Sequence, residues 1–137
     1  MTTNSFISGL KNALKDAEDD AEGLERVLAS LKEMTGLTIE GYEGDYPTFI
    51  EPVYVAPGVK IGDTVLLGPN VFIDEGCELG DFTELSNVLL KKNVKTGKLT
   101  KLNNCIVEEE VELPREFKKS NCFIKSKGGE LEIIDLP

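Results

Sequence analysis

The sequence contains no histidine among its 137 residues. Histidine is the side chain whose unperturbed pKa lies near neutrality, so its absence excludes Ser-His-Asp and Cys-His catalytic pairs and metal sites built from three histidines. Cysteine is scarce as well. Cys77, Cys105 and Cys122 are an odd number without metal-site spacing, so the sequence predicts neither a disulfide framework nor a metal site. We expect all three thiols to fill the core.

Long apolar runs are also missing, because no stretch approaches the roughly 18 residues that a membrane span needs. The N-terminus has neither a basic region nor an apolar signal core, so we expect a cytoplasmic protein that does not enter a membrane. Positive charge is scarce too, and the net charge is −10. Such an acidic surface argues against nucleic acid as a partner. The length predicts one compact domain.

What the sequence does contain is an apolar residue at every sixth position. Four residues after each of these apolar positions, a second small or aliphatic residue occurs. This period fits neither an amphipathic helix nor an alternating strand, and it is typical of a hexapeptide β-helix. The first series is Phe49, Val55, Ile61, Leu67, Ile73, Leu79 and Leu85.

The period shortens after Leu85, where three similar blocks lie 17 residues apart instead of 18. Asn87, Asn104 and Asn121 mark the shortened side and predict an asparagine ladder along one corner. With this correction the chain makes about five turns, whose inward residues form three columns. The columns are Phe49, Leu67, Leu85, Leu102 and Lys119; Val55, Ile73, Leu90, Val107 and Ile124; and Ile61, Leu79, Thr96, Leu113 and Leu131.

The residues before the repeat predict a helical segment. Apolar residues recur there with spacings of three and four from Ile7 to Leu31, and Asn4 or Ser5 can cap the first turn. Gly23 interrupts the pattern, so two alternatives remain: one self-associating coiled-coil stalk, or a kinked helix or helix pair packed on the β-helix. We therefore expect a helical segment at 1–36, a connector at 37–48 and the β-helix domain at 49–137.

From Pro52 to about Pro114 the chain resembles the hexapeptide-repeat C-terminal domain of sugar-phosphate nucleotidyltransferases. An example is the bifunctional N-acetylglucosamine-1-phosphate uridyltransferase and glucosamine-1-phosphate acetyltransferase. The residues that carry the resemblance are PVYVAPGVKIGDTVLLGPNVFIDEGCELGDFTELSN and LLKKNVKTGKLTKLNNCIVEEEVEL. The resemblance implies a left-handed parallel β-helix, an all-β solenoid, with an N-terminal α-helical segment. It also implies a homotrimer, because family members associate through the faces of the prism.

The same resemblance places Lys98 where acetyltransferase members carry the histidine that acts as general base, and Lys101 where they carry a tyrosine. A solvated lysine is protonated at neutral pH and cannot accept a proton. We therefore assign no catalytic residue, metal or cofactor.

Five lysines in eleven residues, from Lys91 to Lys101, have two interpretations. In the 17-residue register, Lys91 lies over Glu108 and Lys95 over Glu112, which predicts cross-strand charge ladders. Lys98 and Lys101 instead lie over Arg115 and Lys118, so we expect them to have no balancing acid. The second interpretation is therefore a ligand site, and its candidate residues are Lys98, Lys101, Asn103 and Asn104.

The functional hypothesis is a stand-alone module that serves trimeric assembly or binds a sugar nucleotide, without a catalytic base of its own. Its partners would be further copies of itself, an anionic sugar phosphate, or a separate nucleotidyltransferase subunit. The alternative is a divergent acyl- or nucleotidyl-transferase that acts on a sugar phosphate.

Overall fold

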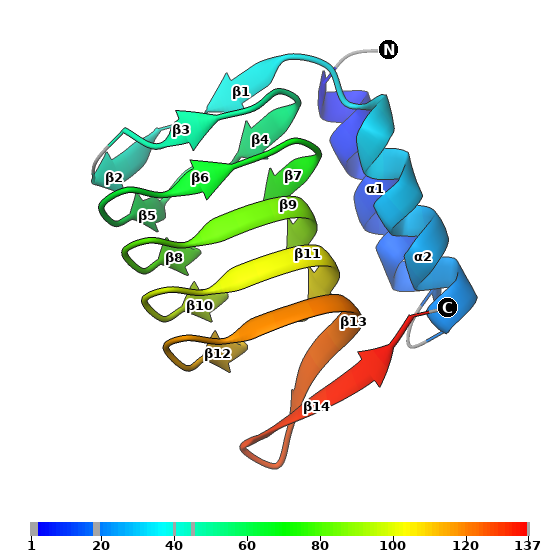
Figure 1. Ribbon diagram of the computed structural model, residues 1–137. Coiled ribbons are helices and arrows are strands. Elements are labelled where there is room, and N and C mark those ends of the chain that lie inside the picture. The colour runs from blue at the N-terminus through cyan, green and yellow to red at the C-terminus, as the bar shows by residue number, and fades with distance from the viewer. Residues whose placement is uncertain (1–2, 18–19, 40, 45, 137) are drawn as a thin grey trace.

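The computed structural model describes residues 3–17, 20–39, 41–44 and 46–136. It is a parallel β-helix of about five turns, with two helices packed along one side (Figure 1). A hairpin extends the coil at its C-terminal end. No helix within these ranges combines the length and the apolar character needed to cross a membrane.

The coil has three faces, which we name the ladder face, the open face and the helix-covered face. The ladder face consists of the short strands β2 (Tyr42–Gly44), β5 (Val59–Ile61), β8 (Glu78–Leu79), β10 (Lys95–Thr96) and β12 (Glu112–Leu113). The open face consists of β3 (Thr48–Phe49), β6 (Leu66–Leu67) and the first halves of β9 (Glu84–Leu90), β11 (Lys101–Val107) and β13 (Lys118–Lys127). The helix-covered face consists of β1 (Leu37–Ile39), β4 (Val53–Val55), β7 (Val71–Ile73) and the second halves of β9, β11 and β13.

The strand register confirms the three predicted columns almost completely. Phe49 pairs with Leu67, and Leu67 with Leu85, and the shortened spacing then pairs Leu85 with Leu102. The prediction was wrong at Leu131, which lies in β14 (Glu130–Asp135). That strand turns back antiparallel to β13, because Gly128 and Gly129, both with positive φ, form a hairpin where a further corner was expected.

The columns form the core inside the coil, where valine, leucine and isoleucine side chains are almost fully buried. Cys77, Cys105 and Cys122 are buried there as predicted. The core opens at the last turn: Lys119 occupies the Leu102 column but is exposed. Terminal repeats of a solenoid often deviate in this way.

Residues 37–48, which composition marks as a connector, contain β1 and β2. Leu37 pairs with Val53, and Tyr42 pairs with Val59. These strands add an irregular first turn to the coil. Ile39 and Tyr42 pack against the core beneath them.

The N-terminal residues form two helices, α1 (Thr3–Ala17) and α2 (Ala21–Ser30), followed by a short 3-10 turn. The second alternative from the sequence is therefore the observed one, and no single stalk forms. Helix α1 already begins at Thr3, before either predicted capping residue. Asp20 separates the two helices and caps α2, because its carboxylate accepts a hydrogen bond from the Gly23 N–H at 3.1 Å.

Both helices bury their apolar sides against the helix-covered face. Phe72, Leu89, Ile106 and Phe123 point outward from successive strands and are almost fully buried beneath the helices. Tyr54 stacks on Phe72 with ring centroids 4.9 Å apart. The helix pair thus supplies a second core on the outside of the coil.

Candidate functional site

The three faces differ in the charge that they present. Each turn places one outward side chain on the ladder face, and the charge of these side chains alternates in sign from turn to turn. They are Glu43, Lys60, Glu78, Lys95 and Glu112. Lys95 Nζ lies 3.5 Å from Glu78 and 3.7 Å from Glu112. The predicted charge ladder is therefore present, and the ladder face is fully charged along its length.

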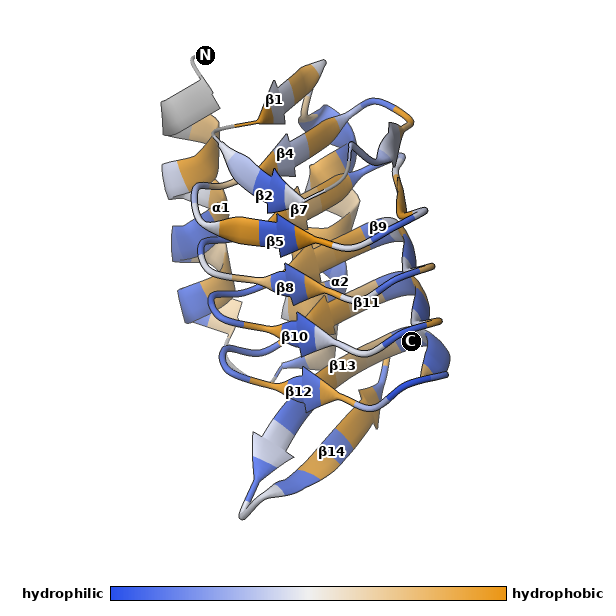
Figure 2. Ribbon diagram, turned by 90° about the vertical axis from the view of Figure 1, so that its left-hand side faces the viewer, coloured by the Kyte–Doolittle hydropathy of each residue, from blue (hydrophilic) through white to orange (hydrophobic). Residues whose placement is uncertain are grey.

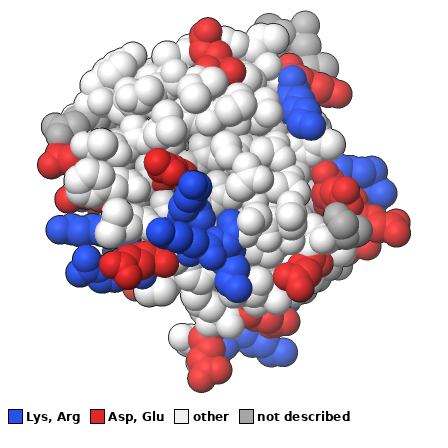
Figure 3. Space-filling model, viewed as in Figure 1, with Lys and Arg blue, Asp and Glu red and all other residues white. Residues whose placement is uncertain are grey.

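The open face carries a different pattern. Its upper turns present Leu66 of β6 and Ile50, which directly follows β3, and its lower strands present Glu84, Lys101 and Lys118. Figure 3 views this face: lysine and arginine gather over the lower strands, whereas the upper half is largely uncharged. Neither helix lies over it in Figure 1.

Two of the four predicted ligand residues already have an acidic partner. Lys98 Nζ lies 3.8 Å from Asp81, and Lys101 Nζ lies 3.6 Å from Glu84. The expectation that these lysines lack a balancing acid was wrong, because the acids lie on the preceding turn. Both lysine side chains are more than 60% exposed, so these ion pairs are weak in water.

The other two predicted residues belong to the corner between the open and helix-covered faces. Asn103 donates a hydrogen bond to the Ser86 hydroxyl at 2.6 Å. Asn104 accepts one from Asn87 and donates another to Asn121 at 2.8 Å. The asparagine ladder is thus confirmed. It also means that Asn104 uses its amide within the coil, while Lys98 stands at the opposite corner.

That opposite corner, between the ladder and open faces, holds two residues that sequence reasoning missed. Phe82 and Leu99 occupy it on successive turns, with φ of +61° and +62°. Their side chains are 51% and 37% exposed. Their N–H groups donate to the carbonyl oxygens of Asp63 and Asp81 at 2.8 and 2.9 Å, which holds the left-handed conformation. In Figure 2 the ribbon is orange, the colour of hydrophobic residues, at the right-hand ends of two successive turns of the coil.

Left-handed backbone is costly for a bulky side chain, and glycine or asparagine normally supplies it. The next corner of the coil follows that rule with Asn87, Asn104 and Asn121, whose φ values lie between +52° and +56°. The only sequence signal for Phe82 and Leu99 was that both apolar residues fall outside the inward columns.

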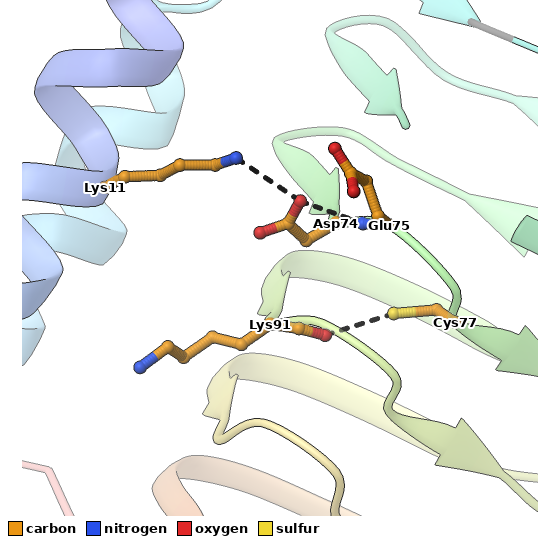
Figure 4. A network of polar contacts seen from close by, with 5 residues as sticks. All are labelled: Lys11, Asp74, Glu75, Cys77 and Lys91. Atoms are coloured by element: carbon orange, nitrogen blue, oxygen red, sulfur yellow. Dashed lines mark hydrogen bonds and ion pairs between the residues drawn. The ribbon is translucent and has the colours of Figure 1, made fainter. Parts of the chain in front are cut away.

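A pocket of about 290 Å³ lies between α1 and the coil. Its lining includes Lys11, Lys15, Lys91 and Lys92. Lys11 pairs with Asp74 at 3.5 Å, and Asp74 also accepts the N–H of Glu75 at 2.8 Å (Figure 4). Lys91 pairs with Glu108, and Glu109 also lines the pocket. The Lys11–Asp74 ion pair joins α1 to the coil, and together with the Lys91–Glu108 pair it neutralises two of the four lysines.

No group of three or more potential metal-binding side chains occurs within the described residues.

The fold is shared with one solved transferase structure. Among solved structures, a mutant of perosamine N-acetyltransferase from Caulobacter crescentus, solved with CoA and GDP-perosamine, matches with a TM-score of 0.51 and 17% identity. The match covers 69% of this chain and 43% of the acetyltransferase. A maltose O-acetyltransferase from Clostridium difficile matches with a TM-score of 0.23 and 11% identity, over 94% of this chain and 84% of that one. The first match identifies the coil as a left-handed β-helix.

A family model named the GMPPB C-terminal domain matches residues 49–127, which is more than half of the chain. The protein therefore belongs to this family of C-terminal domains of sugar-phosphate nucleotidyltransferases. No curated protein matches the chain. The chain spans less than half the length of the perosamine acetyltransferase.

Proposed function

We propose that this protein is an assembly module in which copies of the chain associate as a trimer through the open face and the corner formed by Phe82 and Leu99. The observation that carries the proposal is the exposure of two bulky apolar side chains on successive turns of one corner. Thr64 and Glu116 have the same left-handed backbone there on the turns before and after. In this conformation, which costs roughly 1–2 kcal/mol, Phe82 and Leu99 differ from them in placing apolar surface in solvent, and such surface marks an interaction site.

The character of the faces supports the same choice. The helix pair already covers one face. The ladder face is a continuous row of alternating charges, and desolvating such a row on association is costly. The open face is the remaining one, with Ile50 46% exposed and Leu66 half-buried on its upper turns. Closed symmetric oligomers bury patches of this kind.

An anionic ligand, such as a sugar phosphate or sugar nucleotide, is part of the proposal. Lys98 and Lys101 lie beside the Phe82 and Leu99 corner, and both remain largely exposed despite their acidic partners. Asn103 is exposed at the other edge of the same face. Association through this face would therefore bring Lys98, Lys101, Asn103 and Asn104 of one copy near a second copy. A ligand bound between copies would contact these residues.

A thermal-shift screen with sugar nucleotides, sugar phosphates and acyl-CoA tests the ligand part. Binding to the native state alone raises the melting temperature. We expect a rise with at least one phosphorylated sugar, and its loss in a Lys98→Ala, Lys101→Ala double variant. A Lys60→Ala variant on the ladder face is the matched control and should keep the response. If no phosphorylated sugar changes the melting temperature, the ligand part is wrong.

The proposal assigns no catalytic base to the module, since the sequence has no histidine and lysine stands at position 98. A divergent acyl- or nucleotidyl-transferase is the competing possibility. Measurable acetyl transfer from acetyl-CoA to an amino-sugar phosphate that Lys98→Ala abolishes would establish the transferase instead. The proposal also includes a cytoplasmic location and a separate nucleotidyltransferase subunit as a partner. It divides the chain into a helical segment at 1–36, a connector at 37–48 and the β-helix domain at 49–137.

A further inference from the structure

Two cysteines meet inside the last turns of the coil. Cys105 of β11 and Cys122 of β13 are register partners on adjacent parallel strands. Their Sγ atoms lie 3.5 Å apart, at hydrogen-bonding distance, and both side chains are at most 1% exposed. Directly paired strand residues have the Cα separation that a disulfide requires.

The column to which they belong shows that the pair is a local feature. On the three preceding turns the same position is Val53, Val71 and Val88. Valine thus fills this core position on three consecutive turns above the cysteine pair. Cysteine replaces it on two turns, and these two turns are consecutive.

The position of the pair also gives an oxidant a route. β13 is the last parallel strand, and below it only the antiparallel β14 continues the sheet. Lys119, in the inward column of the same turn, is exposed, so the core is incompletely closed there. Local opening of a terminal strand costs less than global unfolding.

We propose that Cys105 and Cys122 form a reversible intramolecular disulfide, a modification site that links the last two turns of the coil. Hydrogen peroxide is an oxidant small enough to reach it. One thiolate attacks the peroxide and breaks its O–O bond, which gives a sulfenic acid and hydroxide; the hydroxide takes up the proton that the thiol lost and leaves as water. The second thiol then displaces hydroxide from that sulfur, so that one S–S bond forms and a second water leaves.

The hydrogen bond from the Cys122 thiol lowers the pKa of Cys105, which makes Cys105 the attacking sulfur. Cys77 is the internal control. Burial raises its pKa to about 12, and its thiol donates to the Lys91 carbonyl oxygen at 3.1 Å instead of meeting a second thiol.

The test is oxidation of the folded protein with hydrogen peroxide, followed by a thiol count in denaturant and mass spectrometry. We expect the count to fall from the three free thiols to one, with a loss of two hydrogens. Trypsin should then release residues 102–115 joined to residues 120–125. Dithiothreitol should restore all three thiols.

Two variants separate this disulfide from nonspecific oxidation. Cys77→Val should still lose two thiols. Cys105→Val, which restores the residue of the turns above, should lose none. The oxidised wild type should melt about 5–10 °C higher than the reduced form, because the link closes a loop in the unfolded chain. Retention of three thiols, a crosslink that includes Cys77, or a disulfide between chains would overturn the proposal.

Discussion

Lys11 on α1 reaches across to Asp74 on the coil, with 3.5 Å between Nζ and Oδ1. The Asp74 side chain is only 9% exposed, whereas that of Lys11 is 41% exposed. This ion pair fastens the helix pair to the face that it covers, beside the apolar contacts of Leu10 and Leu14.

Removing the lysine should loosen this attachment. In Lys11→Ala, the buried Asp74 carboxylate loses its ion pair and, among the described residues, keeps its bond to the Glu75 N–H. We expect a loss of about 1 kcal/mol in the free energy of unfolding, because the lysine is partly exposed. Lys15→Ala is the control, since Lys15 is exposed in the same pocket, and should cost less than about 0.5 kcal/mol. Equal effects of the two variants in urea unfolding would show that the ion pair contributes nothing.

The asparagine ladder makes a prediction in two parts. Asn104→Ala removes two side-chain hydrogen bonds and puts alanine at φ +56°. We expect a loss of about 2–4 kcal/mol. Asn104→Gly should recover about 1 kcal/mol, since glycine adopts this backbone freely. If the Asn104→Gly and Asn104→Ala variants unfold at the same urea concentration, the backbone at this corner is not strained.

Close stacking of glycines at the corner between the ladder and open faces can be tested in the same way. A Cβ at Gly80 would lie 2.6 Å from the carbonyl carbon of Gly97, so Gly80→Ala should destabilise the protein by more than about 2 kcal/mol or prevent folding. Gly9→Ala is the control, because it is helical with open space around it, and should raise stability by about 0.5–1 kcal/mol. Thermal unfolding of both variants against wild type decides the point.

The columns, their register and the shortened turns were all predictable from the sequence, because a narrow coil must place an apolar residue inward at fixed intervals. The partners of Lys98 and Lys101 were not found. The register was applied only to the following turn, although Asp81 and Glu84 lie 17 residues before them. Phe82 was missed for a physical reason: only glycine and asparagine announce a left-handed corner, and a bulky residue there gives no such signal.

Alkaline pH should weaken the fold through Cys77. Burial raises the pKa of its thiol from 9.0 to about 12. Above pH 9 the unfolded chain releases this proton while the folded chain keeps it, so stability falls as pH rises from 9 toward 12. Cys77→Val preserves an apolar core position and removes the proton. Its stability should therefore decline less steeply over this range in pH-dependent urea unfolding. Parallel curves for the variant and wild type would contradict the prediction.

The proposed assembly of copies through the open face and its corner can be measured by light scattering of the wild type beside a Phe82→Asn, Leu99→Asn double variant. Asparagine accepts left-handed backbone, so the double variant should still fold. A Lys60→Asn variant on the ladder face controls for the surface change. We expect a trimeric mass for the wild type and the control, and a smaller mass for the double variant with an unchanged circular dichroism spectrum. A monomeric wild type, or a double variant that remains trimeric, would overturn the proposal.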